Sequence, residues 1–167
     1  NFVLRLDFKL SPGGNNGVGL RAPLEGDAAY VGMESQILDD TALQYKFLKP
    51  AQYCGSIYMV FPAKRGSLKP VGEWNSEEIK CDGTKITVTL NGTVIVEGDI
   101  KDVTDPETLK THPGLKRTSG HIGFAGHNDP VAFRNIRVKR LGPVVAAAAP
   151  KPEPAPKSAT PAAAPKP

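Results

Sequence analysis

The chain is built from short stretches in which apolar and polar residues alternate, the pattern of β-strands with one buried face. The opening stretch, NFVLRLDFKL, places Phe2, Leu4, Leu6 and Phe8 on one face and mainly charged residues on the other. The same kind of pattern predicts further strands at residues 18–23, 29–38, 52–61, 73–83, 85–99, 119–126 and 131–141. Residues 11–17, SPGGNNG, predict a turn, because Gly and Asn tolerate positive φ.

Asn91-Gly92 gives the strongest turn signal in the chain. The pair is flanked by the strand-forming residues TVTL and VIV, which predicts a two-residue hairpin joining 86–90 to 94–97. Asn91-Gly92-Thr93 also matches a glycosylation sequon, but the hairpin accounts for it. Only residues 39–50 and 102–117 lack the strand pattern, and each is predicted to hold a helical turn. Many short strands with Gly- and Pro-rich turns indicate an all-β sandwich or jelly roll.

The composition changes at Gly142. Residues 142–167 hold eight of the sixteen prolines and no aromatic residue, so they are predicted to form a disordered or extended tail. We expect one domain, residues 1–141, and a tail that links it to another domain or surface. The tail carries three Lys and one Glu, which is +2 of the net +4. The remaining +2 is spread over a domain with charges of both signs, which argues against nucleic-acid binding.

No stretch is long and apolar enough to span a bilayer. Because the sequence starts at Asn1, directly in a strand pattern, we expect that N-terminal strands and a targeting segment are missing from it. Cys54 and Cys81 are either paired in an oxidising compartment or two separate buried thiols.

Candidate chemistry begins in YVGMESQILDD. Alternation puts Glu34 and Gln36 on the face opposite Met33 and Ile37, which suit the core. Glu34 and Gln36 either bind sugar hydroxyls on a concave sheet or belong to an ordinary polar strand face. The alternating carboxylate pair of retaining glycosidases is not visible, because the second position is Gln36 and Asp39 is out of phase.

The last strand pattern carries a second group of polar residues. His127 lies in a Gly-flanked loop, where functional residues concentrate, and Arg134 interrupts the apolar residues of the strand. Arg134 either lines a polar pocket or pairs with Glu34. Trp74 is expected to pack in the core or at a sheet edge rather than to stack on a sugar. His112 and His121 are interpreted as structural or exposed.

Several motifs together resemble the 3-keto-disaccharide hydrolase-like family. They are LSPGGNNGVGLRAP, YVGMESQILDD, YCGSIYMVFPAKRG, LKPVGEWNSEEI and HPGLKRTSGHIGFAGHNDPVAFRNIRV, and they cover nearly all of residues 1–141 in order. The resemblance implies a concanavalin A-like jelly roll that cleaves glycosides oxidised to a ketone at sugar C3. It also implies a carbohydrate substrate and an extracytoplasmic, periplasmic or secreted location. Where relatives commonly have histidine in QYHGSIY, this chain has Cys54.

A ketone at C3 acidifies the C2 proton, so a base can remove it and the C1 substituent can leave by elimination, with water adding afterwards. Such a site needs a general base, a cation or metal for the enolate oxygen, and an acid for the leaving group. The residues we select are Glu34, His127 and Asp39 as catalytic groups, and Arg21, Gln36, Tyr58 and Arg134 as substrate-binding groups. A divalent metal is one option for the cofactor, which stays unknown.

We expect Arg21, Glu34, Gln36, His127 and Arg134 to converge on one concave face. Two guanidinium groups beside Glu34 should lower its pKa. The alternative function is a non-catalytic carbohydrate-binding module, since one fold serves many functions. A laminin-G type interaction module is a third option, supported only by the GEWNSEEI…LNG pattern.

Overall fold

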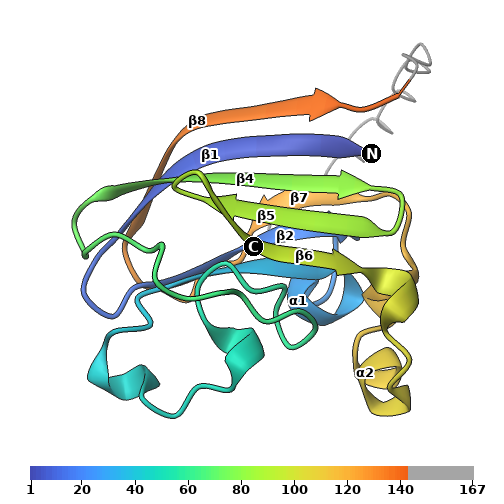
Figure 1. The fold of residues 1–167 in the computed structure, drawn as a ribbon, viewed down its shortest axis with the longest axis horizontal. Helices are drawn as coiled ribbons and strands as arrows, with labels where there is room; N and C mark the ends of the chain where they lie inside the picture. Colours follow the sequence, from blue (N-terminus) through green and yellow to red (C-terminus); the bar gives the residue numbers. More distant parts are fainter. Residues whose placement is uncertain (143–167) are drawn as a thin grey trace, which may run out of the picture.

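The computed structural model describes residues 1–142, so the predicted tail lies outside the described residues apart from Gly142. Two antiparallel sheets form a sandwich (Figure 1), which confirms the predicted all-β class. The larger sheet has the order β6(Thr93–Asp99), β5(Lys85–Leu90), β4(Trp74–Asp82), β1(Phe2–Leu10), β8(Val131–Arg140). The smaller sheet has the order β3(Met33–Leu38), β2(Asn15–Ala22), β7(His121–Phe124).

Short helices occupy the connections between strands. They are α1(Ala28–Val31), η1(Leu43–Tyr45), η2(Pro50–Gln52), η3(Ile100–Asp102), α2(Pro106–Thr111) and η4(Pro113–Lys116). Helical turns thus occur in both segments that lack strand alternation. The start of the predicted strand 29–38 is instead helical, because Asp27 caps the first turn of α1 by accepting a hydrogen bond from the Ala29 N–H (3.0 Å).

The predicted strand 52–61 is the largest error in the secondary structure. It makes only isolated bridges, Ser35 with Ile57 and Ile57 with Phe61. The backbone turns at Met59, which has a φ of 58°, and returns before a ladder can form. The part that passes β3 nevertheless continues the small sheet: the Gln36 N–H donates to the Ser56 carbonyl (2.9 Å) and the Tyr58 N–H donates to the Glu34 carbonyl (2.9 Å).

The core lies between the sheets and follows the predicted alternation. The inward face of β1, Leu4 to Leu10, meets Val18 and Leu20 of β2 and Met33 and Ile37 of β3, all at most 3% exposed. The hairpin prediction is confirmed, since Asn91 and Gly92 have φ values of 49° and 83° between β5 and β6.

One side of the sandwich leaves its inner faces half open. Phe124 of β7, and Ile136 and Val138 of β8, are 45%, 48% and 54% exposed. Val138 is in register with the buried Leu4, so it belongs to the core face of its sheet. β7 has only four residues against ten in β8, so the smaller sheet does not cover the outer end of β8. β8 forms the upper edge of the larger sheet in Figure 1.

Cys54 and Cys81 are both buried and free, so they are two separate thiols. Among residues 1–142, no helix is long and apolar enough to cross a membrane.

Candidate functional site

The candidate site lies on the outer face of the small sheet. Glu34 and Gln36 point away from the core, as alternation predicted, but they are covered rather than solvated, at 5% and 6% exposed. Glu34 is in register with Gly19 of β2, and Gly19 is in register with Gly123 of β7. On its other side, Glu34 is hydrogen-bonded through its carbonyl to Tyr58. A row across this face therefore reads Gly123, Gly19, Glu34, Tyr58.

Three glycines leave the face beside Glu34 without side chains. We call Gly17, Gly19 and Gly123 the glycine floor. A side chain at Gly17 would occupy the position of the Glu34 carboxylate, whereas one at Gly123 would meet no atom within 4 Å. The carboxylate can lean across β2 only because Gly17 has no Cβ.

A cavity of about 470 Å³ opens over the part of this floor formed by Gly19 and Gly123. Gly19 and Gly123 lie at its base, and its walls include Asp27, Ala28 and His127. The loop that carries His127 is held against β2 by the Ala125 N–H, which donates to the Gly17 carbonyl (2.9 Å). His127 therefore lies at the rim of the cavity above Gly19 and Gly123, whereas Glu34 is not among the residues that line this cavity.

Glu34 has the electrostatic character of a base that works near neutral pH. Burial, followed by the nearby charge of Asp27, raises its pKa from 4.5 to about 7. Its Oε1 is buried without a hydrogen-bond partner, as is Oε1 of Gln36. The prediction of a lowered pKa is wrong, because the two arginines expected to act on Glu34 lie elsewhere.

Arg21 is turned away from the site by a register shift in β2 between Gly19 and Ala22. It has a φ of 51° and is 4% exposed. Its guanidinium donates to the Arg117 carbonyl (3.3 Å) and lines a different cavity, together with Phe2 and Val138.

Arg134 lies on the outer face of the other sheet. It donates to Asp7 (3.1 Å) and covers the ring of Trp74 at 3.9 Å, while Asn135 also donates to Asp7 (2.7 Å). Asp7 alternates with the core residues of β1, so this cluster faces away from the small sheet. The expectation that Arg21 and Arg134 share a face with Glu34 is therefore wrong. Trp74, half-buried beneath Arg134, packs at the sheet surface.

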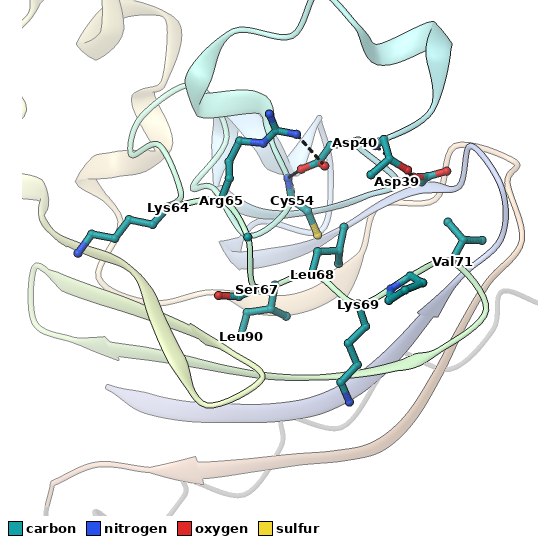
Figure 2. A pocket seen from close by; sticks show the side chains of 13 residues that line it. Asp39, Asp40, Cys54, Lys64, Arg65, Ser67, Leu68, Lys69, Val71 and Leu90 are labelled. Atoms are coloured by element: carbon teal, nitrogen blue, oxygen red, sulfur yellow. Dashed lines mark hydrogen bonds and ion pairs between the residues drawn. The ribbon is translucent and has the colours of Figure 1, made fainter.

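Asp39 lines a separate and larger cavity of about 670 Å³, shown in Figure 2. Its oxygens accept hydrogen bonds from the Gly13 N–H (2.8 Å) and from both N–H (3.2 Å) and O–H (2.6 Å) of Thr41. Burial opposes these bonds, but together they lower the pKa of Asp39. A carboxylate held in this way keeps a turn in place and is a poor base.

Figure 2 also shows Asp40 paired with Arg65 (3.3 Å) beside the Cys54 thiol. Burial raises the pKa of this thiol above its ordinary range, so it is not a nucleophile.

Tyr58 lies next to Glu34, and the ring of a second tyrosine contacts it. Ile57 faces the core, so Tyr58 faces outward with Glu34. The Tyr58 hydroxyl accepts a hydrogen bond from Gln52 (3.1 Å). Tyr30 of α1 lies edge-on to Tyr58, with ring centroids 6.3 Å apart, and against His112 at 5.1 Å.

Sequence reasoning missed Tyr30, Asp27 and the glycine floor. Tyr30 was hidden because its segment was predicted as strand. The Gly-x-Gly spacing of Gly17 and Gly19 was a readable signal, since it removes every side chain from one face of a strand. Asp27 is a residue type that favours helix N-caps, but the strand-forming residues that follow it predicted a strand instead.

The site offers a surface without side chains at Gly19 and Gly123 and, next to Gly19 in the sheet, a buried carboxylate whose pKa of about 7 suits a general base. The residues present give little support for a metal: in residues 1–142 no group of three or more His, Cys, Asp or Glu side chains is placed to hold one. The second carboxylate of the site, Asp27, is occupied in capping α1.

Known proteins of similar sequence and structure indicate the family of this chain. A curated 3-keto-disaccharide hydrolase from Bacteroides thetaiotaomicron is 30% identical over 84% of this chain, which spans 59% of that protein's length. A solved structure from Parabacteroides distasonis, named as a candidate glycosyl hydrolase, is 33% identical, with a TM-score of 0.72 over 84% of this chain and 78% of that one. A second structure from the same organism is 23% identical with a TM-score of 0.66, covers 85% of this chain and 72% of its own, and supports the fold alone. The model of the 3-keto-alpha-glucoside-1,2-lyase-like domain matches residues 1–139, and the chain belongs to that family.

Proposed function

We propose that this protein cleaves glycosides that carry a ketone at C3, by elimination across C1 and C2 with Glu34 as the base. The observation that supports this most is a buried carboxylate with a pKa of about 7, in register with Gly19, which lines the cavity. A base is most effective when its pKa lies near the working pH, because it is then both ionised and basic. The names of the family and of the curated relative point to the same substrate class.

The chemistry follows from the ketone. Glu34 takes the C2 proton, the C2–H electrons form a C2=C3 bond, and the carbonyl electrons move to the C3 oxygen. When the carbonyl re-forms, a C1=C2 bond is made, the C1–O bond breaks and the leaving oxygen takes a proton. We assign that proton transfer to His127, which lines the cavity above Gly19 and Gly123. Addition of water across C1=C2 then completes a net hydrolysis.

The test compares a 3-keto-α-glucoside with the same glucoside before oxidation. We expect release of the C1 substituent from the ketone alone and its loss in Glu34→Gln. Glu77→Gln is the matched control, because Glu77 is also a buried glutamate whose pKa burial raises to about 7, but it faces the core. Cleavage of the unoxidised glucoside, or full activity in Glu34→Gln, would refute the mechanism. Sugar binding without turnover would favour the carbohydrate-binding module instead.

The location of the site has its own test in Gly123→Val. A Cβ there would meet no heavy atom within 4 Å apart from its chain neighbours, so the valine side chain should project into the cavity without straining the fold. We expect a large increase in KM with an unchanged melting temperature. An unchanged KM would place the substrate elsewhere.

A further inference from the structure

Elimination through an enolate needs a group that stabilises the developing charge on the C3 oxygen. Arg21 and Arg134, the two guanidinium groups expected to bind substrate at the site, lie in other parts of the fold. Burial and the negative charge of Asp27 are the two effects that shift the pKa of Glu34. The stabilising group should therefore be sought among the neutral donors around Glu34.

Tyr30 is the neutral donor whose surroundings we consider. It lies in α1, and Ala28 of the same helix packs over Gly19 at the base of the cavity. Its ring is held between Tyr58, 6.3 Å away, and the imidazole of His112, 5.1 Å away. His112 is 4% exposed and its Nδ1 lies 2.9 Å from the Thr111 hydroxyl, so this support is itself fixed. Tyr30 is 38% exposed and remains open to a ligand.

The surroundings keep the Tyr30 hydroxyl protonated. Burial, the neighbouring Tyr58, and the charges of Asp27 and Glu34 all raise the pKa of Tyr30 above its usual value. Tyr58 already accepts a hydrogen bond from Gln52, which leaves its own proton free. A protonated phenol beside a carboxylate base is a combination that serves proton abstraction next to a carbonyl group.

Building on the proposed function, we propose that Tyr30 is a catalytic residue that donates a hydrogen bond to the C3 oxygen of the substrate while Glu34 removes the C2 proton. The donated bond strengthens as the oxygen becomes an enolate and weakens again when the carbonyl re-forms and the C1–O bond breaks. No proton is transferred from Tyr30 in this step: the C2 proton goes to Glu34 and the leaving oxygen is protonated by His127. Tyr58 acts as a positioning residue that holds the Tyr30 ring.

The experiment measures two rates on a 3-keto-α-glucoside, C2 proton exchange in D₂O and release of the C1 substituent. Tyr30→Phe should lower kcat for both by about 10²- to 10³-fold, the usual effect of removing one such donor. KM and melting temperature should change little. Tyr53→Phe is the matched control, because Tyr53 stacks on Arg65 near the other cavity, and it should retain full activity. Full kcat in Tyr30→Phe would overturn the proposal while leaving Glu34 as the base.

A second variant separates catalysis from structure. 3-Fluorotyrosine at position 30 keeps the ring and hydroxyl but lowers the phenol pKa. The alkaline limb of the pH–rate profile should move to lower pH, and the acid limb set by Glu34 should stay. An unmoved alkaline limb would overturn the role of Tyr30. If the unaltered protein does not exchange the C2 proton at all, while binding the sugar, the proposed function fails and this role fails with it.

Discussion

Replacing Glu77 with glutamine should remove a large part of the pH dependence of this protein's stability. Glu77 lies on β4 and points into the core, where it is 1% exposed. Its Oε1 accepts a hydrogen bond from the Ser35 hydroxyl (2.9 Å), and its Oε2 is buried without a partner. Burial, only partly offset by the Ser35 bond, raises its pKa from 4.5 to about 7.

The sign and size follow from proton linkage. Between pH 4.5 and 7 the folded protein holds a proton on Glu77 that the unfolded chain has already lost, so the free energy of unfolding falls as the pH rises. The stabilisation is complete below about pH 4.5 and is lost as the pH rises through about 7. A pKa difference of this size corresponds to about 3 kcal/mol. Glu34 titrates over the same range and should contribute a similar slope.

Urea unfolding between pH 5 and pH 8.5 measures this directly. The range avoids Asp39, whose lowered pKa acts only at more acidic pH. Glu77→Gln keeps the acceptor for Ser35, should lose about half of the unaltered protein's pH dependence, and should be the more stable of the two at pH 8. Glu78→Gln, a partly exposed neighbour paired with Arg5, should leave the slope unchanged. An unaltered slope in Glu77→Gln would show that this carboxyl does not titrate near pH 7 in the folded protein.

Three further predictions follow from other sites. kcat/KM on a 3-keto-glucoside should rise with pH and level off near pH 7 as Glu34 ionises; a profile already flat from pH 5 would contradict Glu34 as the base. Gly92→Val should lower the free energy of unfolding by about 1–2 kcal/mol, because a β-branched residue resists a φ of 83°; an unchanged melting temperature would contradict the strain. Arg134→Met should cost about 0.5–1 kcal/mol through the lost contact with Asp7 and leave turnover intact, whereas a loss of turnover would return Arg134 to the active site.

Alternation was sufficient to predict most of the strands and the outward position of Glu34, because side-chain direction in a strand depends only on local geometry. It failed for Arg21, where a register shift in β2 reverses the side chain and no local pattern announces the shift. It also failed for Arg134, because the sequence does not tell which sheet β8 joins. The pKa of Glu34 depends on what covers it, and burial by distant segments is a property of the tertiary fold alone.

Glu77 shows that some of the missing information was readable. It shares the apolar phase of β4 with Ile79 and Cys81, so a carboxylate in the core was predictable from the pattern of that strand. The position of Tyr30 in a helix was not predictable. Asp27 favours a helix start, whereas the residues that follow it favour a strand, and only the observed hydrogen bond decides between the two.

The half-open edge at β8 has a consequence for how copies of this protein behave toward one another. Within residues 1–142, β8 pairs with β1 on one side only and exposes Ile136 and Val138, and a strand edge of this kind is a template for intermolecular pairing. Residues 131–140 also carry three Arg and one Lys but no acidic residue. When two such edges approach each other, their basic side chains repel, and this repulsion opposes self-association through β8. Salt screens the repulsion, so self-association should begin in concentrated solutions at high ionic strength.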